Sequence, residues 1–158
     1  MSEENVEIVR RHLAPYEGQD VVPAFREMVD QLGPAPESDA VLALWAEDPA
    51  WCHVHREVVW ETFAGGPSDA KMAGPAEVGR WWATDWANAW EVYTYRVVEY
   101  RDLGEWVLTP VEVRATGRGG IPVEMRTFEI RRVRDGKIAV IKVFGTEEEA
   151  LEAAGLSE

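Results

Sequence analysis

The sequence predicts a single α+β domain spanning residues 1–158, with helices gathered in the first half and a largely antiparallel sheet in the second. In the first third of the chain apolar residues recur at three- and four-residue steps, whereas after Trp90 bulky residues alternate with polar ones. Because the helical and strand patterns are segregated, a doubly wound α/β fold is excluded. A chain of 158 residues is also long enough to bury a core without a disulfide or a metal.

We expect four helices before the main run of strands and one after it. Their apolar stripes are Val6, Val9, Leu13 and Tyr16; Val22, Phe25, Val29 and Leu32; Val41, Leu42 and Trp45; and Val78, Trp82, Trp86 and Ala89. Gly33-Pro34 ends the second stripe. Residues 63–74 are predicted to form a loop, after which Pro75 suits the first turn of a helix that runs to about Trp90. The tail EEEALEAAGLSE predicts a short closing helix stopped by Gly155.

Strands are expected at residues 56–62, 92–100 and 106–115, and as a hairpin within residues 123–144. The hairpin, VEMRTFEIRRVRDGKIAVIKVF, contains the turn signal Asp135-Gly136 and carries Glu129 and Arg131 in the middle of one strand. Because a one-residue slip would move both charges from the solvent face to the buried face, the register of this hairpin decides their role.

Two registers of the hairpin are open. A two-residue turn at Asp135-Gly136 places Glu129 opposite Lys142 and Arg131 opposite Val140, which gives surface ion pairing. A type I turn at Arg134-Asp135, with Gly136 left-handed in a bulge, places Glu129 opposite Ile141 and Arg131 opposite Ala139. We favour the second register, because the row Ala139, Ile141 and Val143 is wholly apolar and suits a core face. The buried charges would then form either a structural ion pair or a site shared with a substrate.

Composition excludes several classes of partner. The chain has 29 acidic and 16 basic side chains and a net charge of −13, which repels nucleic acid and anionic membrane surfaces. Cys52 is the only cysteine, so no internal disulfide forms, and the N-terminal MSEENVEIVRR lacks the features of a signal peptide. No apolar run approaches the roughly eighteen residues of a membrane span. We therefore expect a cytoplasmic protein with no nucleic-acid or membrane partner.

Several segments resemble the SnoaL-like proteins of the NTF2-like superfamily. They are SEENVEIVRR, EVVWET, GPAEVGRWWATDWANAWEVY, the hairpin given above and EEEALEAAGLSE, which together cover most of the chain. The resemblance implies a curved sheet wrapped around helices as a cone with one deep cavity. Members include polyketide cyclases, ketosteroid isomerases and limonene epoxide hydrolases, so the fold alone does not assign a reaction. Residues 33–55 are longer than the usual family connection and are a candidate lid.

The resemblance implies two catalytic positions besides Glu129. His12 matches a tyrosine of steroid-isomerase-like members that donates a hydrogen bond to a developing oxyanion, and Glu61 matches their carboxylate base on the first strand. The purely structural alternatives are a half-exposed helix histidine and a glutamate on the cavity rim.

The resemblance also excludes the epoxide-hydrolase mechanism. The water-activating and proton-donating residues of limonene epoxide hydrolases are replaced here by Val111, Val113 and Val143, which can only line the cavity. The remaining candidates for ligand contact are Arg131, Tyr16, Trp60, Trp82 and Trp86. Tryptophans at helical spacing, such as Trp82 and Trp86, are more often core than ligand cage. Cys52-His53-Val54-His55 is a weak metal motif, because two-residue steps along a strand are common by chance, and we expect no metal and no cofactor.

Two classes of function remain. The first is an enzyme that isomerises, cyclises or dehydrates a small, apolar, cyclic molecule, with Glu61 as base, Glu129 and His12 as proton donors or oxyanion stabilisers, and Arg131 orienting a polar group. The second is a non-catalytic module that binds a hydrophobic ligand or another protein. In either case a homodimer through the sheet is expected, because its outer face carries the apolar residues Phe128, Ile130, Ile138 and Val140.

Overall fold

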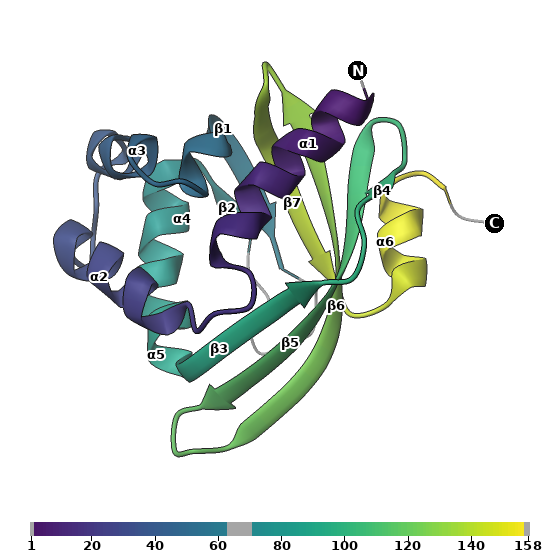
Figure 1. Cartoon of the computed structure of the whole chain (residues 1–158). Coiled ribbons are helices and arrows are strands. Elements are labelled where there is room, and N and C mark those ends of the chain that lie inside the picture. The colour runs from purple at the N-terminus through teal and green to yellow at the C-terminus, as the bar shows by residue number, and fades with distance from the viewer. Residues whose placement is uncertain (1, 63–70, 157–158) are drawn as a thin grey trace.

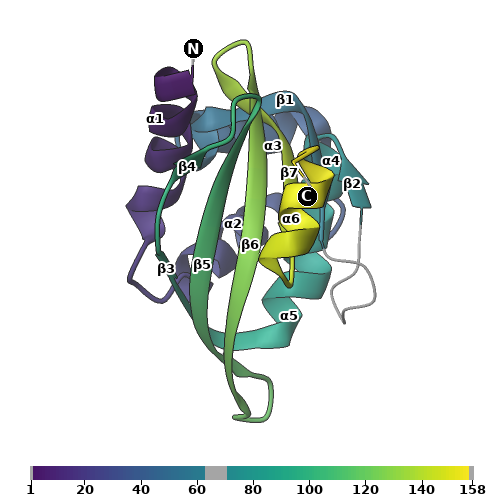
Figure 2. The ribbon, with the colours of Figure 1, turned by 90° about the vertical axis from the view of Figure 1, so that its right-hand side faces the viewer.

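The computed structural model describes residues 2–62 and 71–156 and has the predicted α+β architecture (Figure 1). The helices are α1 (Ser2–Leu13), α2 (Val22–Leu32), α3 (Ser38–Ala46), α4 (Pro75–Trp81), α5 (Ala87–Ala89) and α6 (Glu147–Ala153). Helices α1 to α5 lie toward one face of a curved sheet, and α6 lies against the other face (Figures 1 and 2). Short 3₁₀ turns occur at Ala14–Tyr16 and Trp51–His53, and a π turn at Trp82–Trp86.

The sheet runs in the order β2-β1-β7-β6-β5-β3, with β4 paired to β5. Its strands are β1 (Val54–Glu61), β2 (Lys71–Ala73), β3 (Trp90–Val97), β4 (Arg101–Asp102), β5 (Trp106–Gly117), β6 (Pro122–Arg134) and β7 (Lys137–Phe144). Strands β1 and β7 run parallel, and the other described pairs are antiparallel. The parallel pair brings an early strand beside the C-terminal hairpin, so residues far apart in the sequence share one concave face.

The main core lies between this concave face and the helices. Val113 of β5 and Ile141 of β7 are at most 2% exposed and belong to the same buried cluster as Val9 of α1. Helix α3 approaches α4 closely at Gly79, where an added Cβ atom would lie 3.0 Å from Val41 Cγ2. Burial of these apolar stripes is the dominant favourable contribution to folding.

The outer face of the sheet is covered by α6. The Thr146 hydroxyl accepts the backbone N–H of Glu149 at 3.2 Å and donates to that residue's carboxylate at 2.9 Å, which fixes the start of the helix. Ala150 is then fully buried in a cluster with Trp106, Leu108 and Ile130.

The dimer prediction assumed that the outer face of the sheet exposes four apolar residues, and the position of α6 shows that this assumption is wrong. Ile130 is fully buried beneath α6, and Ile138 is fully buried in the main core on the opposite face. Phe128 and Val140 remain half-buried beside α6. The predicted bare apolar face is therefore largely covered by the chain itself.

The hairpin buries Glu129 and Arg131, as predicted, but through neither of the two expected registers. Asp135 and Gly136 form a two-residue turn with φ angles of 53° and 74° between Arg134 and Lys137. A bulge between Arg132 and Val133 then shifts the ladder, so that Glu129 pairs with Val143 and Arg131 with Ile141. The structure therefore combines the two-residue turn of the first alternative with the buried face of the second.

Other departures from the predictions are local. The helix expected to continue to Trp90 changes to the π turn after Trp81. Strand β2 occupies part of the predicted loop, whose residues 63–70 lie outside the described ranges. Strand β3 ends at Val97, whereas the prediction had one strand run unbroken to residue 100, and the short strand β4 follows.

Candidate functional site

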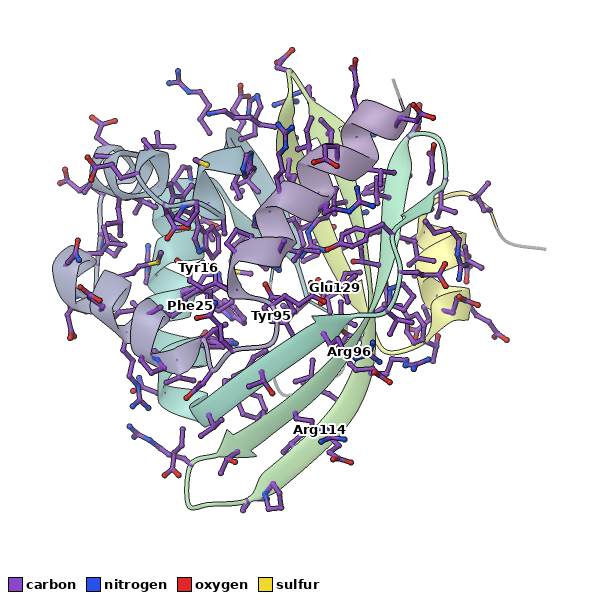
Figure 3. All side chains as sticks on the ribbon, viewed as in Figure 1. Tyr16, Phe25, Tyr95, Arg96, Arg114 and Glu129 are labelled. Carbon is purple, nitrogen blue, oxygen red and sulfur yellow. The ribbon has the colours of Figure 1, made fainter. Side chains whose placement is uncertain are left out.

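A cavity of about 360 Å³ lies between the concave face of the sheet and the helices. Six of the eight tryptophans line it: Trp51, Trp60, Trp81, Trp82, Trp86 and Trp90. Phe25, Tyr16, Tyr93 and Tyr95 add four further aromatic rings. In Figure 3 the labelled side chains Tyr16, Phe25, Tyr95 and Glu129 lie between helices and sheet, whereas the exposed Arg114 lies outside. The volume and the flat aromatic walls suit a small, ring-containing ligand.

The π turn builds one wall of the cavity. A π turn adds one residue to a helical turn, and such insertions are frequent at functional sites. Here the consecutive residues Trp81 and Trp82 both reach the cavity, together with Trp86. The ring centroids of Trp82 and Trp86 are 4.6 Å apart, and Phe25 of α2 meets Trp82 edge-on at 5.0 Å. These contacts hold the indole rings in place.

Asp48 organises a second wall. One of its carboxylate oxygens accepts the backbone N–H groups of Ala50 at 2.8 Å and Trp51 at 2.9 Å, and the other accepts the Tyr16 hydroxyl. Trp51 then stacks on Trp45 with ring centroids 5.1 Å apart. The long segment 33–55, expected to be a candidate lid, thus contributes a fixed part of the wall at Ala50 and Trp51.

The polar end of the cavity holds a buried ion pair from β6. Arg131 Nη2 donates to Glu129 Oε1 at 2.8 Å, and Thr127 Oγ1 donates to Glu129 Oε2 at 3.0 Å. Arg131 Nη1 donates to Thr109 Oγ1 of β5 at 3.3 Å. The side chains of Arg131 and Glu129 are only 3% and 15% exposed. Their mutual charge neutralisation is what makes this degree of burial tolerable.

His12 of α1 is buried and also lines the cavity. Its Nδ1 lies 3.0 Å from the carbonyl oxygen of Ala50, which can only accept, so Nδ1 carries the proton. Burial and the positive charge of Arg131 lower the pKa of His12 to about 3, although the bond to Ala50 acts in the opposite direction. The imidazole is therefore neutral near pH 7, and its Nε2 atom is a hydrogen-bond acceptor. The predicted role of proton donor is wrong for this tautomer.

Two tyrosines of β3 complete the polar end. Burial raises the pKa of the Tyr93 hydroxyl, and the nearby Glu129 carboxylate raises it further. Burial also raises the pKa of Tyr95, whose hydroxyl donates to the Leu13 carbonyl. Both side chains are therefore neutral phenols near pH 7.

The structure brings most of the predicted site residues to one cavity. They are His12, Tyr16, Trp60, Trp82, Trp86, Val111, Glu129, Arg131 and Val143. Val113 is buried in the core and does not line the cavity. Val111 and Val143 make this part of the wall apolar.

Glu61 is placed on the wrong side of the sheet for its predicted role as base. Its neighbour Trp60 pairs with Ile141 on the inner face, so Glu61 pairs with Lys142 on the outer face. The Glu61 carboxylate lies 3.4 Å from Lys142 Nζ and 4.0 Å from Lys71 Nζ. It is a surface ion-pair residue outside the cavity.

The sequence analysis missed several lining residues. On β6, Val123, Met125 and Thr127 face the cavity in step with Glu129 and Arg131. The two-residue period of a strand, extended toward the N-terminal end of β6, would have found all three. On β3, Tyr93 and Tyr95 share a face by the same rule. No local sequence pattern predicts that Trp51 lines the cavity, because its position depends on the hydrogen bond from its backbone N–H to Asp48.

The weak metal motif does not form a ligand cluster. His53 ends a 3₁₀ turn and so does not project from a strand beside His55. The His55 Nδ1 atom accepts the N–H of Glu57 at 2.9 Å. Across residues 2–62 and 71–156, no group of three or more His, Cys, Asp or Glu side chains is arranged to hold a metal ion.

The chain is similar to known proteins in sequence and in structure. The family model of the SnoaL-like domain matches residues 25–141, well over half of the chain. An NTF2-like protein from Burkholderia thailandensis has a similar structure, with 22% identity and a TM-score of 0.60 over 96% of this chain and 95% of that one. None of the curated proteins compared with the chain is significantly similar to it.

Two further solved structures are similar. TerC, co-crystallised with polyporic acid, has 13% identity and a TM-score of 0.60, with 97% of each chain covered. An epoxide hydrolase of M. tuberculosis that is similar to limonene epoxide hydrolase has 14% identity and a TM-score of 0.56, covering 92% of this chain and 84% of that one. At these identities the likeness shows a shared fold alone.

Proposed function

This chain belongs to the SnoaL-like domain family, and on that basis we propose that it binds a flat, apolar, ring-containing small molecule in the cavity. The observation that carries the proposal is the concentration of six tryptophans around one cavity that also holds a buried ion pair. Aromatic rings provide large apolar contact at little entropic cost, and the polar end can orient a polar substituent. The structural neighbour TerC was co-crystallised with polyporic acid, which is consistent with this proposal.

Blocking the cavity tests the proposal. Met125 lines the cavity, whereas its neighbour Glu124 is 75% exposed. We expect Met125→Trp to weaken binding of 2-naphthol by at least about tenfold, because the larger ring occupies the ligand space. Glu124→Trp, which adds the same ring outside the cavity, should leave binding unchanged. Titration calorimetry measures both, and equal affinities in the two variants would contradict the proposal.

A second candidate function is catalysis of a proton transfer, as in isomerisation, cyclisation or dehydration. The observation that favours it is the position of Glu129, the carboxylate among the described residues that lines the cavity. With Glu61 on the outer face, Glu129 takes the role of base, and Arg131 orients it through the 2.8 Å ion pair.

Proton exchange tests this second candidate. If Glu129 is the base, the protein should accelerate exchange of the acidic ring protons of 2-tetralone in D₂O, followed by NMR. Glu129→Gln should lower that rate at least about a hundredfold, the usual contribution of general base catalysis. Glu61→Gln makes the same substitution outside the cavity and should have no effect. A wild-type protein without acceleration would contradict this second candidate function.

Two further properties stay as proposals. Dimerisation through the sheet now depends on Phe128, Val140 and Phe144, which α6 leaves half-buried. A cytoplasmic location is the second of these proposals. Among the residues with a described structure, no helix combines the length and apolar character needed to cross a membrane.

A further inference from the structure

Two side chains of the cavity, His12 and Glu129, offer hydrogen-bond acceptors. His12 uses its N–H on the Ala50 carbonyl, which leaves Nε2 as a lone-pair acceptor, and no described residue donates to it. Glu129 supplies a second acceptor. Its two carboxylate oxygens each receive one bond, from Arg131 and Thr127, although an ionised carboxylate offers about four lone-pair sites.

Several donors at the polar end of the cavity are used within the protein. The Tyr16 and Tyr95 hydroxyls donate to Asp48 and to the Leu13 carbonyl. The Arg131 Nη atoms donate to Thr109 and Glu129. Three other N–H groups, on Arg131 Nε, Trp60 Nε1 and Trp82 Nε1, have no partner among the described atoms but are buried away from contact with a ligand. The Tyr93 hydroxyl and the indole N–H groups of Trp51, Trp81, Trp86 and Trp90 also line the cavity and remain available as donors toward a ligand.

We propose that the cavity selects a ring that carries a hydroxyl group, and that this hydroxyl donates its hydrogen to the unpaired acceptor His12 Nε2. The inference rests on the proposed binding function and adds the chemical class of the ligand. A ligand without a donor would displace water from this acceptor and leave it without a hydrogen-bond partner, which lowers the affinity. This is the reverse of a site that stabilises an oxyanion with donors, the role predicted for His12 from the family resemblance.

A pair of matched probes tests the inference. 2-Naphthol and 2-methoxynaphthalene share the same fused ring, but the methyl ether can only accept a hydrogen bond. Titration calorimetry at pH 7 should give at least about tenfold tighter binding of 2-naphthol to the wild-type protein. In His12→Phe, which keeps a ring but removes the Nε2 acceptor, the ratio of the two affinities should fall toward one. In Glu61→Gln, whose carboxylate lies outside the cavity, the ratio should stay at its wild-type value.

The outcomes separate this inference from the proposed function. Equal affinities in the wild-type protein, or tighter binding of the ether, would overturn the donor requirement while leaving ring binding in place. Failure of both probes to bind at millimolar concentration would overturn the binding function and the inference with it. The wild-type ratio decides the question even where His12→Phe does not fold, since the bond to Ala50 is also lost in that variant.

Discussion

The role of His12 is set by one hydrogen bond to a residue 38 positions away. Its place beside the apolar stripe of the first helix predicts that it can reach a cavity, but no sequence pattern specifies which ring nitrogen carries the proton. The Ala50 carbonyl makes that choice, and Ala50 is itself positioned by Asp48. A predicted donor therefore becomes an acceptor through contacts that are remote in sequence.

We expect His12 to make stability depend on pH. Its pKa is lowered from 6.5 to about 3 in the folded protein by burial and by the charges of Arg131 and His53, so below pH 6.5 the unfolded chain binds a proton that the folded protein does not. The stability it contributes is complete above pH 6.5 and is lost as the pH falls toward 3, at up to about 1.4 kcal/mol per pH unit. Urea unfolding should show a loss of about 1 kcal/mol between pH 7.5 and 5.5.

The control for this dependence is His12→Gln, which removes the titrating group. Its free energy of unfolding should change less than that of the wild type over the same pH interval, whatever its absolute stability. The other groups that titrate there, such as His53, are common to both proteins. An identical loss in the two proteins would show that His12 does not cause it.

Strand and helix positions were predictable where the determinants are local. Glu129 and Arg131 lie two residues apart on one strand, so their common face followed from the sequence alone. Glu61 was misplaced because its face is decided by the parallel pairing of β1 with β7, which no local pattern reveals. The bulge after Arg132 was missed for the same reason, since the favourable two-residue turn by itself predicts the opposite face.

The π turn shows the limit of periodicity within a helix. Trp82, Trp86 and Trp90 are spaced by four residues, so an uninterrupted helix was the natural prediction. In the structure Trp81 also faces the cavity, and an ordinary helix cannot direct two consecutive residues to the same side. The extra residue of the π turn accommodates both. Packing of bulky rings around the cavity, rather than local propensity, determines this element.

The overall architecture was predictable because helical and strand patterns occupy separate parts of the chain, and the family match is consistent with it. The cavity was only partly predictable. Its walls come from α1, α2, the segment around Trp51, the π turn and five strands, and their separations depend on long-range packing. Six tryptophans within residues 51–90 line it. The sequence shows how many tryptophans the chain has, but it does not show that six of them meet around one cavity.

The covering helix α6 determines whether the sheet is free to associate. Without it, the cluster around Trp106, Leu108 and Ile130 would form an apolar surface on the outer face. The dimer prediction assumed such a surface. In the folded chain, Ala150 packs against this cluster, so the same apolar residues are buried within the protein itself. The assembly state should therefore respond to the docking of this one helix.

We expect Ala150→Asp to undock α6 and Ala153→Asp to leave it in place. Ala150 is fully buried, so an aspartate there places an unpaired charge in an apolar cluster and should cost about 3 kcal/mol of unfolding free energy. Ala153 is exposed on the same helix, and the same change there should cost less than about 1 kcal/mol. Urea unfolding measures both costs, and sedimentation velocity should show stronger concentration-dependent association of Ala150→Asp than of Ala153→Asp. Equal stability and assembly in the two variants would mean that α6 does not protect the outer face.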